Sequence, residues 1–291
     1  MKHFFVFTLC LRPLFAAPAF LSQTGLYSDL PRKILSAEVA SYIPRFPLWS
    51  DGIEKQRWIR LPAGTQVDKS DPNAWVFPVG TQLFKEFAWH GQRVETRLIQ
   101  KKGESQWEFV SYVWNGDETE AKLAPSTGIQ SHLPLTDTIF HDIPSQGQCR
   151  FCHQRFGDPV LGYSQIQLGS EPIPGHSSLE RAALGYLHGN CGSCHHPEGR
   201  AGFTENFYHL TVEASTAEQT PAYTTSVNLK TVNFPIPGLE TTYRLLPGHP
   251  EQSALIYRLT LEGPQHMPSL GSKIPDATQI NLLRQWVAEM H

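Results

Sequence analysis

The chain contains the pattern Cys-x-x-Cys-His twice, as CRFCH at residues 149–153 and as CGSCH at residues 191–195. The one remaining cysteine is Cys10, near the N-terminus. In this pattern both thiols bond to the vinyl groups of one haem, and the histidine supplies a nitrogen to the iron. The repeat therefore predicts two covalently bound haem c groups, each with an axial histidine. The residues concerned are Cys149, Cys152 and His153 in the first motif, and Cys191, Cys194 and His195 in the second.

Three other uses of four cysteines compete with haem attachment. The thiols could bind one zinc ion, form a reactive dithiol, or form two disulfides. Each of these leaves the two histidines unexplained. With 13 histidines in 291 residues, a histidine follows both motifs by chance only about once in 500 cases. Haem attachment accounts for the cysteines and the histidines together.

The N-terminus has the form of a secretory signal peptide. It begins with Lys2, continues through an apolar run, and reaches Ala17-Pro18-Ala19, a small-x-small cleavage pattern. We predict a signal peptide over residues 1–19 and a periplasmic or secreted protein. A buried N-terminal helix is the alternative, since Arg12 interrupts the apolar run.

Composition and charge argue against a membrane-spanning segment and against nucleic-acid binding. No other stretch is apolar over about 18 residues, so we expect no transmembrane segment after cleavage of the signal. The formal net charge is −3 and no long basic run is present, which argues against a nucleic-acid binder.

Two amphipathic helices are predicted around the second motif. Apolar residues recur at helical spacing from Leu179 to Leu187, with Ser177 or Ser178 in the N-cap position. The same pattern returns over residues 276–287, with Asp276 as the cap. The loop before this last helix contains Met267 in GPQHMPSLG.

A methionine thioether raises the potential of a haem and blocks exogenous ligands. We therefore predict Met267 as the sixth ligand of the second haem, with the neighbouring His266 as its substitute.

These features together resemble class I c-type cytochromes. In that family a short helix leads into the attachment motif, a methionine loop precedes the last helix, and the two helices cross beside the haem. LPGHPEQSALIYRL at residues 246–259 and HHPEGRAG at residues 195–202 resemble further segments of the same family. The resemblance covers residues 175–291 and implies a mainly α-helical cytochrome c-like domain.

The first motif lacks an evident sixth ligand, because no internal methionine is left for it. Its surroundings, FHDIPSQGQCRFCHQRFGDPVLGYSQIQLG, resemble those of exported bacterial di-haem proteins of unassigned function. His141, His188 and His196 are the candidate distal ligands, with His132, His176 and Met290 behind them. The alternative is an open position on the iron, which is typical of catalysis or sensing.

The N-terminal half is rich in short alternating strands. Turn signals at His90-Gly91, Lys102-Gly103 and Asn115-Gly116 separate them, which predicts an antiparallel sandwich or barrel. Several aromatic and charged side chains could line a site there or serve as core and solvated surface. They are Trp49, Asp51, Glu54, Lys55, Trp58, His90, Glu95, Arg97 and Trp114.

We expect a multidomain protein with an N-terminal antiparallel β-rich domain at 20–145, a first haem-attachment segment at 146–174, and a mainly α cytochrome c-like domain at 175–291. The expected function is electron transfer to an unidentified redox partner protein. One alternative is a peroxidase-like or oxidase-like haem enzyme, with an open first haem and the second haem as electron relay. Another is an electron-transfer subunit whose β-domain binds a sugar or a dehydrogenase.

Overall fold

The structure is a computed structural model, and it describes residues 17–153, 158–231 and 233–290. Most of the predicted signal peptide, residues 1–16, lies outside the described residues. Its last three residues contact the strands that follow: the Tyr112 hydroxyl donates to the carbonyl of Pro18, and the backbone N–H of Leu123 donates to that of Ala19. No helix in the described parts of the chain is long and apolar enough to cross a membrane.

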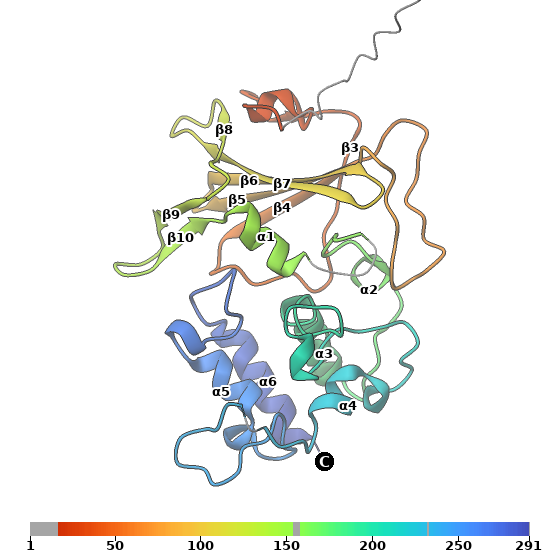
Figure 1. The fold of residues 1–291 in the computed structure, drawn as a ribbon, viewed down its shortest axis with the longest axis vertical. Helices are drawn as coiled ribbons and strands as arrows, with labels where there is room; N and C mark the ends of the chain where they lie inside the picture. The colour runs from red at the N-terminus through yellow and green to blue at the C-terminus, as the bar shows by residue number, and fades with distance from the viewer. Residues whose placement is uncertain (1–16, 154–157, 232, 291) are drawn as a thin grey trace, which may run out of the picture.

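Strands fill the first half of the chain and α-helices the second (Figure 1). The strands are β1 (Tyr27–Asp29), β2 (Ile34–Leu35), β3 (Val39–Ser41), β4 (Glu54–Arg60), β5 (Gln82–Trp89), β6 (Gln92–Gly103), β7 (Gln106–Trp114), β8 (Ala121–Leu123), β9 (Ile129–Pro134) and β10 (Phe140–Ile143). The α-helices are α1 (Gln146–Cys152), α2 (Gln165–Leu168), α3 (Ser178–Asn190), α4 (Pro221–Ser226), α5 (Ala254–Thr260) and α6 (Ala277–Glu289). Short 3-10 helices lie at Leu21–Gln23, Gly202–Thr204, Ala217–Gln219, Pro250–Gln252 and Gly263–Gln265.

The predicted antiparallel β-rich region is confirmed as a six-stranded meander in the order β3-β4-β5-β6-β7-β8. Within the described chain the edge strands β3 and β8 do not pair with each other, so the sheet is open. The prediction of a barrel, one of the two alternatives, was therefore wrong. His90 and Gly91 form the β5–β6 turn, both with positive φ, as two-residue hairpins require. The predicted turn at Lys102-Gly103 falls later, because β6 continues through Gly103.

The two faces of this sheet differ in chemistry. The outer face packs Trp58, Phe84, Leu98 and Tyr112 against the N-terminal segment around Leu21. The inner face, which turns toward the helices, carries polar and charged residues among its apolar ones: Arg57, Leu83, Lys85, Arg97, Ile99 and Phe109. The sheet therefore has one ordinary hydrophobic face and one face that lines a cavity.

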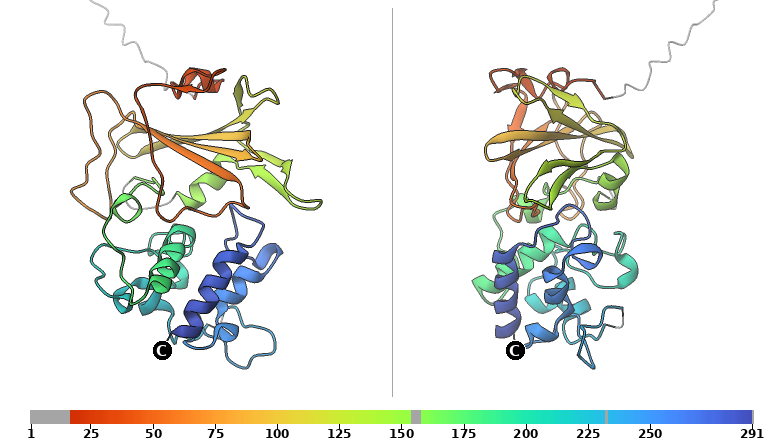
Figure 2. Two further views of the ribbon diagram at one scale, coloured as in Figure 1. Left: turned by 180° about the vertical axis from the view of Figure 1, so that it is seen from behind. Right: turned by 90° about the vertical axis from the view of Figure 1, so that its left-hand side faces the viewer.

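Helices α3 to α6 form a separate layer below the sheet in Figures 1 and 2, whereas α1 lies against the sheet. The predicted helices before the second motif and after the Met267 loop are confirmed as α3 and α6, which pack against each other. The caps are also as predicted: Ser177 accepts from the N–H of Glu180, and Asp276 accepts from that of Gln279. Their shared core contains Leu184, Leu187, Leu283, Trp286 and Val287.

Residues 44–51 tie the two layers together. The backbone N–H of Trp49 donates to Asn190 at the end of α3, and its indole N–H donates to the carbonyl of Ile274, both at 2.7 Å. The Asp51 carboxylate accepts the backbone N–H groups of Lys273 and Ile274. Trp49 and Asp51 thus hold the loop after Met267, which gives them a structural role at the junction of the layers.

Candidate functional site

A cavity of about 980 Å³ lies between the inner face of the sheet and the helices. This volume is at the upper end of the roughly 300–1,000 Å³ that ligand pockets occupy. All four motif cysteines, both motif histidines and Met267 line it. The two motifs, which are 42 positions apart in the sequence, therefore open into one space.

The first motif is carried by helix α1. Ser145 caps the helix by accepting the N–H of Gln148, and His153 follows Cys152 as the C-cap residue. The His153 ring lies 5.2 Å from the Phe109 ring of β7, and its Nδ1 lies 2.7 Å from the carbonyl oxygen of Pro159. Burial lowers the pKa of His153 to about 4, and the charges of Lys85 and Arg97 act in the same direction.

The second motif follows helix α3 directly. Cys191 caps the helix, and the His195 ring lies 5.4 Å from that of Tyr208. Nδ1 of His195 lies 2.8 Å from the carbonyl oxygen of Asn206. Burial also lowers the pKa of His195, with the charge of Arg258 adding to the effect.

Both motif histidines are therefore held in the same way. Each ring can donate its Nδ1–H to a backbone carbonyl, which fixes the tautomer and leaves Nε2 as the nitrogen with the available lone pair. Their lowered pKa values favour the neutral ring, which is the form that binds metal.

The motifs also touch each other within the cavity. The interaction between the thiols of Cys152 and Cys194 raises the pKa of Cys152 and lowers that of Cys194. None of these four cysteines forms a disulfide bond in the structure. The first motif further lies beside Arg97, whose charge acts on Cys149 and Cys152.

Met267 and its neighbour His266 have different surroundings. Met267 lines the cavity and packs against the helical core, and its N–H donates to the carbonyl of Arg258. His266 is buried and does not line this cavity; its Nδ1 lies 2.9 Å from the Leu261 carbonyl oxygen. The methionine is the better placed of the two to reach a group held by Cys191 and Cys194.

The other candidate histidines divide into two groups. His141 and His188 line the cavity, but Nε2 of His141 lies 2.9 Å from the Glu95 carboxylate, and Nδ1 of His188 accepts the N–H of Leu210. The remaining candidates do not line the cavity: His132, His176, His196 and Met290.

His209 was missed by the sequence analysis, although it lines the cavity. Its position follows from the hydrogen bond between the N–H of Tyr208 and the carbonyl of His195. Nothing in the local sequence marked it, because that contact closes a loop after the second motif.

The cavity is strongly cationic even though the whole chain is acidic. Among the described residues, seven cationic side chains line it, against two carboxylates. The cations are Arg57, Lys85, Arg97, Arg200, Arg244, Arg258 and Lys273; the carboxylates are Asp51 and Asp142. Burial and the neighbouring charges of Arg57 and Arg97 hold the pKa of Lys85 well below its usual range.

No family model matches the chain, and neither a curated protein nor a solved structure matches it. Within the described residues, no three or more His, Cys, Asp or Glu side chains are grouped to hold a metal ion by themselves. Arguments about function therefore come from the cavity and the side chains that line it.

Proposed function

We propose that this protein is an exported di-haem c-type cytochrome that transfers electrons. Residues 175–291 would form its class I cytochrome c-like domain, and residues 1–19 its export signal. When bound, the haem iron supplies one-electron oxidation and reduction. The chain's part is to hold two such groups by four thioether bonds, at Cys149, Cys152, Cys191 and Cys194.

One observation carries the proposal: both CxxCH motifs open into the same cavity with the same histidine arrangement. In each motif a backbone carbonyl, of Pro159 or Asn206, accepts from Nδ1 and leaves Nε2 for the iron. This support for a ligand histidine is common in metal sites. Neither zinc binding nor two disulfides would account for a repeated arrangement of the histidines.

The residues fit haem in three further respects. The lining is largely apolar around Leu83, Ile99, Phe109 and Leu255, as a porphyrin face requires. Met267 opens into the same space and would give the second haem a thioether ligand. The cationic side chains would balance the carboxylates that haem carries.

A second candidate function is a haem enzyme with an open first haem. The observation that favours it is that the two candidate histidines in the cavity already have protein hydrogen-bond partners. Nε2 of His141 contacts the Glu95 carboxylate, and Nδ1 of His188 accepts the N–H of Leu210. Neither ring is arranged for ligation as His153 and His195 are. An unligated position would let a small molecule reach the iron.

Carbon monoxide separates the two candidates. The purified, reduced holoprotein is exposed to carbon monoxide, and its visible spectrum is recorded before and after. An electron carrier with two six-coordinate haems gives no change. If one of the two haems binds carbon monoxide, and its ferric form is high-spin, the enzyme is the better assignment and simple electron transfer is rejected.

A further inference from the structure

Three cations face one another across the inner face of the sheet. The register places Arg57 of β4 opposite Lys85 of β5, and Lys85 opposite Arg97 of β6. Directly opposed residues of an antiparallel sheet point to the same face, and like charges there destabilise it. All three side chains line the cavity.

Among the described residues, a carboxylate pairs with one of these three cations. Arg97 pairs with Glu95, which is fully buried. The Lys85 ammonium lies 4.8 Å from the centre of the Phe87 ring, but neither it nor the Arg57 guanidinium forms a hydrogen bond or ion pair with another described residue. A partly buried cation without a partner is costly.

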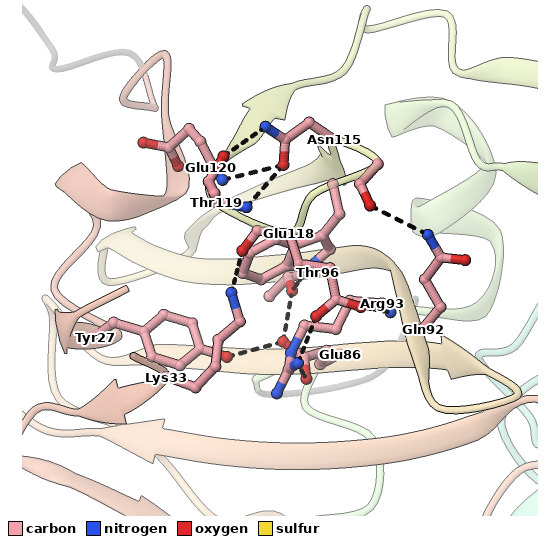
Figure 3. Close-up of polar contacts among 12 residues, drawn as sticks. Tyr27, Lys33, Glu86, Gln92, Arg93, Thr96, Asn115, Glu118, Thr119 and Glu120 are labelled. Atoms are coloured by element: carbon pink, nitrogen blue, oxygen red, sulfur yellow. Dashed lines mark hydrogen bonds and ion pairs between the residues drawn. The ribbon is translucent and has the colours of Figure 1, made fainter. Parts of the chain in front are cut away.

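On the outer face of the same sheet, by contrast, a cation is paired with carboxylates. There Arg93 donates to Glu86 at 2.9 Å and to Glu118 at 2.8 Å, and the Tyr27 hydroxyl also donates to Glu86 (Figure 3). That cation has two carboxylates. On the inner face, Arg57 and Lys85 together have none, although both faces belong to the same strands.

An anion that enters the cavity would supply the partner that Arg57 and Lys85 lack among the described residues. The His153 ring lies 5.2 Å from the ring of Phe109, which is two residues along β7 from Ser111, the residue opposite Arg97. Lys85 and Arg97 line the same cavity as this motif. The three cations therefore line the wall of the cavity that the sheet forms, in the same space as the first attachment motif. A group held by that motif would bring its own acidic substituents within their reach.

We propose that Arg57 and Lys85 bind the carboxylate groups of the haem attached at Cys149 and Cys152. This inference rests on the proposed function. It assigns the β-domain a definite role: its sheet forms one wall of the first haem site and neutralises the charge of the haem. In the haem-bound protein, the haem carboxylates would then neutralise this row of cations, as Glu86 and Glu118 neutralise Arg93 on the outer face.

The test is a redox titration of the holoprotein carrying Lys85→Met, after mass spectrometry has shown that both haems are attached. A cation close to the haem favours the reduced form. We expect one of the two redox equilibria to shift about tenfold toward the oxidised form, which corresponds to about 59 mV for one electron. The other haem acts as an internal control. Lys85→Arg should keep the wild-type value, and Lys122→Met, at an exposed position of β8, should leave both potentials unchanged.

Arg57→Gln supplies a second, independent variant and should shift the same haem in the same direction. If both haems are present and neither variant moves either potential, the inference is overturned while the proposed function stands. If wild type has no haem, the proposed function itself fails. Adding acetate to the holoprotein tests whether Arg57 and Lys85 bind a free carboxylate in place of the haem carboxylates. We expect no change in the haem spectrum. A saturable spectral change that Lys85→Met abolishes would overturn the assignment.

Discussion

The two CxxCH motifs have similar histidines but very different surroundings. The second is built locally: it follows α3, packs beside α6, and shares the cavity with Met267. The first is built from distant parts of the chain, because α1 lies against β7 and its histidine contacts Phe109 in the cavity that Lys85 and Arg97 also line. If both motifs hold haem, as proposed, the difference predicts two sites of distinct ligation and potential, one typical of electron carriers and one without an evident distal ligand.

Removing the cysteines of one motif at a time should have the largest effect and tests directly whether the two sites differ. Cys149→Ser/Cys152→Ser should leave one haem, with the spectrum of histidine–methionine ligation, because only the Met267 site is occupied. Cys191→Ser/Cys194→Ser should leave one haem without that signature. Mass spectrometry and visible spectra check both. Identical spectra from the two variants would show that the sites do not differ.

Met267→Ala should alter the second haem alone. Loss of the thioether should abolish a near-infrared methionine–iron band and lower one reduction potential, since methionine ligation raises it. Met290→Ala is the matched control, because Met290 lies in the helical core away from the cavity. A wild-type spectrum for Met267→Ala would remove this residue from the site.

Glu95→Gln should destabilise the first site's wall. Glu95 is fully buried and contacts both Arg97 and His141, and breaking a buried ion pair costs roughly 3 kcal/mol of unfolding free energy. Denaturant titration of the holoprotein measures this. Glu54→Gln, at an exposed position of β4, should cost little, and equal effects for the two substitutions would contradict the buried-pair argument.

The same pair gives a pH dependence. Burial raises the pKa of Glu95, but Arg97 and His141 outweigh it and lower the value to about 2. A carboxylate whose pKa is lowered by folding stabilises the folded protein fully at a pH above its ordinary pKa of 4.5. That contribution to stability is lost as the pH falls toward the folded-state pKa of about 2. Glu95→Gln should therefore reduce the acid dependence of stability between about pH 4.5 and 2.

Gly189→Ala should loosen the junction of the two layers. A Cβ at Gly189 would lie 2.3 Å from the backbone oxygen of Phe46, so the chain around residue 46 must shift. Overpacking of this kind costs roughly 1–3 kcal/mol, measurable as a lower Tm. Gly116→Ala is the control, since nothing lies within 4 Å of its Cβ position. An unchanged Tm for Gly189→Ala would mean that the junction is not close-packed.

Sequence patterns predicted the locally determined parts of the molecule. Helices α3 and α6, their caps and the His90-Gly91 turn follow from periodicity and from residues close in sequence. The register that aligns Arg57, Lys85 and Arg97 depends on pairing between strands, which no local pattern encodes. The contact of Cys152 with Cys194 and the position of His209 likewise depend on how the layers meet.

The most direct measurement is the intact mass of the exported, purified wild-type protein. Peptide mapping then shows which cysteines carry the added mass. The account predicts a mass increase of two haems, one on the Cys149/Cys152 peptide and one on the Cys191/Cys194 peptide. A mature chain with no added haem, or with disulfides or zinc on these four cysteines, would contradict it.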